Sequence, residues 1–135
     1  MLAFVDSSAF KAIYDARDDF HGRASELMRR IAVRDTEVTG FVTTDYVLDE
    51  AVTLTGFAHS HAKAVELADA AMASKFVEVV YCDEQLFSEG MSTFKGHPDK
   101  EWSFTDCVSF AAMRKHGIRT AFDAHFRQAG FATVP

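Results

Sequence analysis

Carboxylates stand at the ends of predicted strands or in the helices that follow them, where folding could bring them together. Asp6 follows the apolar run over residues 2–5, and Asp123 closes a later strand. Asp106 opens the long C-terminal helix, and Asp45, Asp49 and Glu50 follow the second strand. The carboxyl ends of parallel strands share one edge of a sheet, where ligands bind. Carboxylates that converge there repel each other without a cation, and their hard oxygen ligands suit Mg²⁺ or Mn²⁺. Such ions activate water and stabilise the leaving oxygen of a phosphoryl displacement.

The same acids have structural explanations that compete with metal chemistry. Asp before a helix is a common N-cap, Ser103 with Asp106 fits a capping box, and Asp123 fits a cap of its own turn. At about 100° per residue, Glu50 and Asp45 border opposite sides of the apolar stripe on their helix. Spacing alone therefore leaves metal binding and capping open, and it does not select Glu50 over Asp45.

Apolar periodicity predicts that strands alternate with pairs of helices along the chain. This alternation indicates an α/β fold, a parallel sheet with helices on both faces. We expect one domain over residues 1–135, with Ser7 or Ser8 as the N-cap of its first short helix and Gly56 as the end of the third. Strands are predicted at residues 2–5, 37–43, 76–81, 119–122 and 131–134, and helices at 8–14, 20–34, 45–55, 60–74, 83–94 and 103–115, with a helical turn at 123–128.

Composition limits the function classes. The chain has 135 residues, 48% of them apolar, and no apolar run near the roughly 20 residues that span a bilayer. We see no signal peptide, and Cys82 and Cys107 are far apart, so we expect reduced thiols and a cytoplasmic protein. The net charge of −6 argues against a non-specific nucleic-acid coat protein, which would be basic. It allows an enzyme that holds metal ions in an acidic pocket and contacts phosphates through a few local cations.

The order of these motifs resembles that of PIN-domain ribonucleases, most closely the VapC-type toxins of prokaryotic toxin–antitoxin pairs. Each motif alone is weak, but the order, the spacing and the length match over residues 2–134. The motifs are Val5-Asp6-Ser7-Ser8-Ala9, Thr44-Asp45-Tyr46-Val47-Leu48-Asp49-Glu50, Ser103-Phe104-Thr105-Asp106 and Phe122-Asp123-Ala124-His125-Phe126.

The resemblance implies a three-layer α/β/α domain with a five-stranded, mostly parallel sheet. It implies Mg²⁺- or Mn²⁺-dependent cleavage of RNA, by in-line attack of water that leaves a 5′-phosphate. A small antitoxin is the expected partner, and a homodimer the expected assembly.

The acidic quartet of the family carries over onto Asp6, Glu50, Asp106 and Asp123. By this resemblance Asp6 and Asp106 are direct metal ligands, Glu50 orients the attacking water or binds metal through water, and Asp123 completes a second metal position. The hydroxyls of Ser7 and Thr105 occupy the supporting positions beside the first and third acids. Asp45 then becomes a helix cap and Asp49 a solvated surface residue.

Two other functions remain open at this point. One is a PIN-fold nuclease that processes RNA without an antitoxin. The other is an acidic, flavodoxin-like binding or signalling domain, in which an Asp accepts a phosphoryl group. A phosphoryl-accepting domain of this kind needs a Lys near the pocket, and the sequence has no clear Lys at a strand end.

Several residues outside the quartet have a structural and a functional interpretation. His59 and His61 are two residues apart and do not face each other on a helix, so we expect surface histidines. We expect a structural role for His125, although it follows Asp123 closely. Trp102 is either a core residue or a base-stacking surface. The apolar side chains of Ala62, Val65, Ala68 and Met72 are expected in the core, or at a contact with a homodimer partner or antitoxin.

Overall fold

Five strands and six helices form the described part of the chain, which in this computed structural model comprises residues 1–121 and 129–133. Within these ranges no helix is long and apolar enough to cross a membrane. The strands are β1 (Leu2–Phe4), β2 (Gly40–Thr44), β3 (Val77–Val80), β4 (Thr120–Ala121) and β5 (Ala132–Thr133). The helices are α1 (Ser7–Tyr14), α2 (His21–Ala32), α3 (Asp45–Ala58), α4 (His61–Ala73), α5 (Glu84–Gly96) and α6 (Phe104–Lys115).

The sheet has the order β3-β2-β1-β4-β5, and all four pairs of neighbouring strands are parallel. From β1 the chain moves outward through β2 to β3, and it then crosses back to β4 on the other side of β1. Right-handed crossovers therefore place α1 to α4 over one face and α5 and α6 over the other. Because the direction of the connections reverses between β1 and β4, the crevice for a ligand is expected at the carboxyl ends of these two strands. The predicted five-stranded three-layer α/β/α fold is confirmed.

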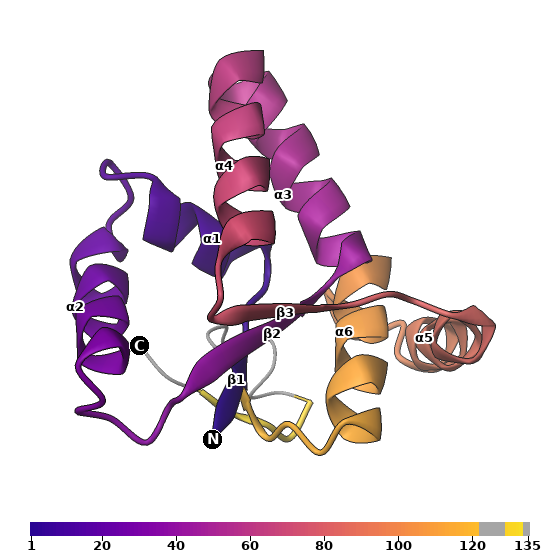
Figure 1. Cartoon of the computed structure of the whole chain (residues 1–135). Helices are drawn as coiled ribbons and strands as arrows, with labels where there is room; N and C mark the ends of the chain where they lie inside the picture. The colour runs from indigo at the N-terminus through magenta and orange to yellow at the C-terminus, as the bar shows by residue number, and fades with distance from the viewer. Residues whose placement is uncertain (122–128, 134–135) are drawn as a thin grey trace.

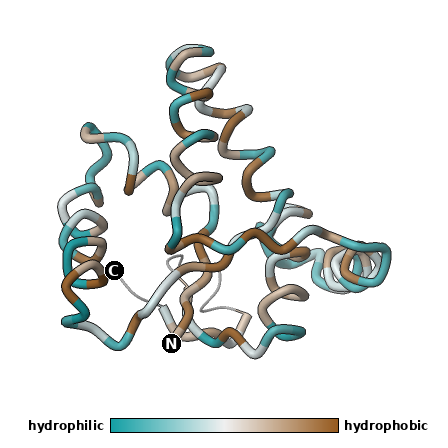
Figure 2. Tube along the Cα trace, in the orientation of Figure 1, coloured by the Kyte–Doolittle hydropathy of each residue, from teal (hydrophilic) through white to brown (hydrophobic). Residues whose placement is uncertain are grey.

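The central strands are buried and read as almost continuous apolar sequence, as expected for a sheet covered on both faces. Phe4, Phe41 and Val42 are each 2% exposed or less. Figure 2 shows hydrophobic residues concentrated along these strands. Trp102 is 8% exposed and packs its ring edge against Phe110 at 4.9 Å between centroids, so it is a core residue and not a stacking surface.

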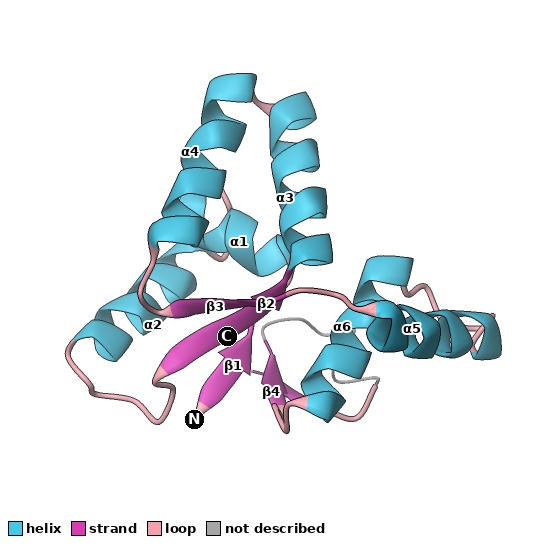
Figure 3. Cartoon of the chain, turned by 45° about the vertical axis from the view of Figure 1, so that its right-hand side comes forward, coloured by secondary structure: helices cyan, strands magenta, loops and turns pink. Residues whose placement is uncertain are grey.

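The α3 and α4 helices form a hairpin that rises above the sheet, while α5 and α6 pack against each other beside it (Figures 1 and 3). The end of α3 expected at Gly56 is wrong, and so is the core position expected for Val65 and Met72. The alternative for α4, a contact with a homodimer partner or antitoxin, stays a prediction. Gly56 does not end α3, which continues through the glycine to Ala58. The side of α4 that faces the core carries Ala64, Leu67 and Ala71, whereas Val65 and Met72 are 43% and 58% exposed. Apolar residues lie on several sides of α4, so its contacts with α3 and β3, and not the sequence pattern, select the buried side.

Candidate active site

Asp6 follows the carboxyl end of β1, beside β4, and caps the next helix. Its Oδ1 accepts a hydrogen bond from the backbone N–H of Ala9 at 2.9 Å. The Ser8 hydroxyl donates to Oδ1 at 3.0 Å and to Oδ2 at 3.2 Å. The expectation that Ser7 or Ser8 caps α1 is therefore wrong: the carboxylate caps the helix, and Ser8 supports the carboxylate. Asp6 is 8% exposed, so it is held in one position at the strand end.

Asp106 lies in the first turn of α6, in the predicted capping box. Its Oδ2 accepts the backbone N–H of Ser103 at 3.0 Å, and its own N–H donates to the Ser103 hydroxyl at 3.0 Å. Both partners are local, so the sequence motif alone produces this geometry. A carboxylate has about four acceptor sites in its two oxygens. Capping and metal binding by one carboxylate are therefore compatible.

Glu50 is half-buried in the second turn of α3, and Asp49 beside it is exposed, as expected. The cap of α3 is Thr44, whose hydroxyl accepts the N–H of Val47 at 3.1 Å. Asp45 is therefore not the cap. Its Oδ1 accepts the backbone N–H of Cys82 at 2.9 Å, which connects the start of α3 to the chain leaving β3.

The helices that follow or carry these acids are neighbours, because α3 contacts both α1 and α6. Thr105, the predicted supporting hydroxyl, is half-buried in the first turn of α6 beside Asp106. Asp123 and His125 lie outside the described residues. Within residues 1–121 and 129–133, no three His, Cys, Asp or Glu residues form a group that could hold a metal ion. Asp6, Glu50 and Asp106 are therefore not brought together as such a group, and the four-acid metal site with Asp123 stays a prediction.

Two cysteine thiols, one beside Asp106 and one beside Asp45, have raised pKa values. Burial raises the pKa of the Cys107 thiol to about 11, and the adjacent Asp106 carboxylate adds to the rise. Burial also raises the pKa of Cys82, with a further contribution from Asp45. In both cases burial is the larger cause and the neighbouring carboxylate the smaller one. The carboxylate oxygens of Asp6 and Asp106 are of the kind that hard divalent ions prefer.

An aromatic cluster includes sequence neighbours of two of the acids and could not be found from local sequence. The Phe104 ring contacts Tyr46, Phe87 and Phe94 at centroid distances of 6.0, 5.2 and 6.2 Å. These rings come from α3, α5 and α6, and only the packing of the three helices brings them together. Phe104 precedes Thr105 and Asp106 directly, and Tyr46 lies one turn before Glu50 on α3.

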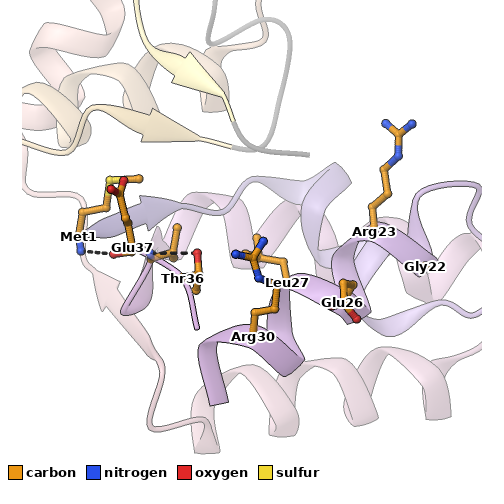
Figure 4. Close-up of a pocket in the computed structure, with 9 residues that line it drawn as sticks. Met1, Gly22, Arg23, Glu26, Leu27, Arg30, Thr36 and Glu37 are labelled. Carbon is orange, nitrogen blue, oxygen red and sulfur yellow. Dashed lines mark hydrogen bonds between the residues drawn. The ribbon is translucent and has the colours of Figure 1, made fainter. Parts of the chain in front are cut away.

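A cavity of about 670 Å³ lies far from these acids, beside the amino end of β1. In Figure 4, Met1 and Glu37 lie on one side of it and α2 residues such as Glu26 and Arg30 on the other. The Met1 ammonium donates to the Glu37 carbonyl at 2.6 Å. Ligands of parallel α/β sheets bind at the opposite, carboxyl edge, so we do not assign the active site to this cavity.

The histidine pair near the α3–α4 turn is also not a metal site. His59 lies 3.2 Å from the Asp15 carboxylate and also contacts Arg17. The partners of His59 therefore lie in the loop after α1. His61 is exposed. The expectation of surface histidines agrees with this arrangement. Here His59 links the hairpin to the end of α1.

Comparison with known proteins identifies the family. The PIN domain profile matches residues 3–132. The chain belongs to the PIN-domain family. The 23S rRNA-specific endonuclease VapC20 of Mycobacterium tuberculosis is 35% identical over 98% of this chain and 98% of its own length. The predicted resemblance to VapC-type toxins is confirmed.

Solved structures agree with the family. The crystal structure of Mycobacterium tuberculosis VapC20, described as a Sarcin-Ricin loop cleaving toxin, superposes with a TM-score of 0.86 at 34% identity. The match covers 99% of this chain and 98% of that one. FitAcB from Neisseria gonorrhoeae matches with a TM-score of 0.66 at 15% identity, over 100% and 97% of the two chains. At that identity the match supports the PIN fold alone.

Proposed function

We propose that this PIN-domain protein is a divalent-metal-dependent endoribonuclease that acts as the toxin of a toxin–antitoxin pair. The observation that carries the proposal is the 35% identity with a 23S rRNA-specific endonuclease over nearly the whole of both chains. Asp6 precedes α1, Glu50 lies on α3 and Asp106 on α6, and the contact of α3 with both other helices supports the proposal. Ribosomal RNA is the proposed substrate class, and the cytoplasm the proposed location.

The proposed roles follow from how each acid is held. Asp6 and Asp106 are fixed by capping hydrogen bonds, and a fixed carboxylate loses little freedom when it binds a cation. We assign them as the direct ligands of Mg²⁺ or Mn²⁺. When bound, the ion supplies activation of water and stabilisation of the leaving oxygen at the phosphodiester.

The other assigned groups position the reactants. Glu50, on the second turn of α3, orients the attacking water, and Asp123 completes the acidic set from the segment after β4. The Ser8 hydroxyl holds the Asp6 carboxylate through its donated hydrogen bonds. Ser7 and Thr105 retain their assignment as supporting hydroxyls. In-line attack of water leaves a 5′-phosphate and a 3′-hydroxyl.

A cleavage assay on total RNA tests the nuclease proposal. The wild-type protein is expected to cut RNA in Mg²⁺ or Mn²⁺, to stop in EDTA, and to leave 5′-phosphates at mapped sites. Asp6→Asn is expected to fold and not cut. Asp49→Asn is the matched control, because Asp49 is an exposed acid next to Glu50, and it is expected to cut normally. Metal-independent cutting, or full activity in Asp6→Asn, would contradict the assignment.

The proposed protein partners are a small antitoxin and a second copy of the chain. The α3–α4 hairpin exposes large apolar side chains, including Phe57 at 87% and Leu54 at 55%. Exposed apolar surface of this kind is typical of protein contacts. We expect expression to arrest growth and co-expression of the antitoxin to restore it. Expression without arrest would favour an RNA-processing nuclease instead. The mass in solution, measured by light scattering, tests the homodimer.

A further inference from the structure

We infer that the aromatic cluster formed by Tyr46, Phe87, Phe94 and Phe104 is a stacking platform for an unpaired RNA base next to the bond that is cut. The inference rests on the proposed nuclease function and adds to it a group that holds the substrate. Its starting point is Tyr46, which is four residues, one helical turn, from Glu50 and therefore lies on the same side of α3. Phe104, two residues from Asp106 on α6, does not share a side with that acid, but its ring contacts Tyr46 at 6.0 Å. The cluster therefore continues from the side of α3 that carries Glu50.

The rings of the platform hold one another in place. Phe104 stands in the middle, with the rings of Phe87 and Phe94 edge-on to it at interplanar angles of 67° and 83°. Phe87 and Phe94 are seven residues apart on α5, two helical turns, and so lie on the same side of the helix. Rings restrained by one another lose little further freedom when a base stacks on them.

Part of the platform is open to solvent. Phe87 is 42% exposed and Phe94 is 46% exposed, while Tyr46 and Phe104 are half-buried between the helices. The cluster is therefore only partly used in packing α5 against α6. Two half-exposed rings match one or two nucleobases. A specific protein interface needs about 20 to 30 residues on each side, so RNA fits this patch better than a second copy of the chain.

The charge of the protein gives a reason for such a platform. The net charge is −6, and the candidate acids at this edge add local repulsion of phosphates. General attraction between cations and the RNA backbone, which supplies most non-specific affinity, is therefore weak here. Stacking of bases on aromatic rings is independent of charge, and each ring typically contributes enough to change the affinity about tenfold. The platform would thus hold the RNA at a place where the acidic residues repel its phosphates.

The test measures binding of a labelled, mixed-sequence single-stranded RNA decamer by fluorescence anisotropy in EDTA, where no cutting occurs. The variant Phe87→Leu/Phe94→Leu keeps apolar side chains and removes both exposed rings. We expect the dissociation constant to rise about tenfold or more. Phe87→Tyr/Phe94→Tyr keeps the rings and should bind within about twofold of wild type. Phe57→Leu is the matched control, because Phe57 is an exposed ring near the other end of α3, 11 residues after Tyr46.

A second arm uses the same decamer with abasic nucleotides. The wild type and the leucine variant should bind it equally, because no base remains to stack. With the RNA substrate in Mg²⁺, the leucine variant should raise KM about tenfold and change kcat less.

Several results would overturn the platform. One is that the leucine variant binds the intact decamer as tightly as wild type. Another is that the tyrosine variant fails to bind it. A third is that the leucine variant loses as much affinity for the abasic RNA as for the intact decamer. A lower mass for the leucine variant in light scattering would also overturn it, because the patch would then be a protein interface. Failure of the nuclease proposal looks different: the wild type would not cut in Mg²⁺ or Mn²⁺, while the ring-dependent binding in EDTA would remain.

Discussion

The Oδ1 of Asp6 accepts the backbone N–H of Ala9 at 2.9 Å, so the residue assigned to metal binding is also the N-cap of α1. The two uses involve the same carboxylate but different properties of it. Capping needs one oxygen acceptor near the helix N-terminus, whereas metal binding needs the full negative charge. Substitutions at this position can therefore separate stability from activity.

Asp6→Asn should remove cleavage and leave stability nearly unchanged, because Asn and Asp are similarly good caps. Asp6→Ala should remove cleavage and also lower the free energy of unfolding by about 1 kcal/mol, the usual cost of a lost cap. Urea unfolding and the Mg²⁺-dependent cleavage assay measure the two effects. If both variants were equally unstable, Asp6 would stabilise the fold through something other than its cap.

The capping box at α6 allows the complementary experiment. Ser103→Ala removes the hydroxyl that accepts the Asp106 N–H, and it should cost about 0.5–2 kcal/mol of stability. The Ser103 backbone N–H still donates to Asp106 Oδ2, so the carboxylate keeps its position and cleavage should persist. Ser103→Thr keeps an acceptor and serves as the control. Loss of cleavage in a folded Ser103→Ala protein would give the serine hydroxyl a direct role.

Asp45 is predicted to be a structural residue. Asp45→Ala would leave the partly buried N–H of Cys82 without its acceptor and should lower stability by about 1–3 kcal/mol. Asp45→Asn keeps the Oδ1 acceptor and should lose much less. Both variants should cut RNA at normal rates once folded. A strong loss of activity in folded Asp45→Asn would instead place Asp45 in the acidic site, the alternative that helix geometry left open.

Local signals predicted most of the fold. The alternating elements, the buried first strand and the Ser103–Asp106 box depend on neighbours within a few residues, so the sequence contains their causes. The errors arose where the deciding contact is distant. Asp45 looks like a cap in the sequence, but Thr44 performs that role and Asp45 bonds to Cys82, 37 residues away.

Local sequence likewise predicted some residues of the candidate site and not others. The strand-end and helix-start positions of Asp6 and Asp106 follow from local pattern, whereas choosing Glu50 over Asp45 required the family resemblance. The aromatic cluster beside the acids was not predicted, because its four rings come from three helices that meet only in the folded protein. Tertiary packing, which periodicity does not encode, decides such features.

Gly90 is predicted to be essential for the contact between α5 and α6. A Cβ at this position would lie 2.8 Å from Cγ2 of Val108 and 3.2 Å from its backbone N and Cα. Gly90→Ala should therefore destabilise the protein by about 1–3 kcal/mol through overpacking, although Ala favours helices. In Gly22→Ala, on α2, the new Cβ meets nothing within 4 Å, so stability should rise by about 0.5–1 kcal/mol. Equal thermal stability of the two variants would show that the helices separate easily.

Cys107 should make stability fall with rising pH in the alkaline range. Its side chain is fully buried, and its pKa is raised from the ordinary 9.0 to about 11. Above pH 9 the unfolded chain releases this proton while the folded chain keeps it, so the free energy of unfolding decreases. The decrease approaches about 1.4 kcal/mol per pH unit for one such group and ends near the folded pKa. Urea unfolding of wild type and Cys107→Ala from pH 7 to 10.5 isolates this contribution. The stability advantage of wild type should shrink above pH 9, and a constant advantage would mean that the thiol ionises equally in both states.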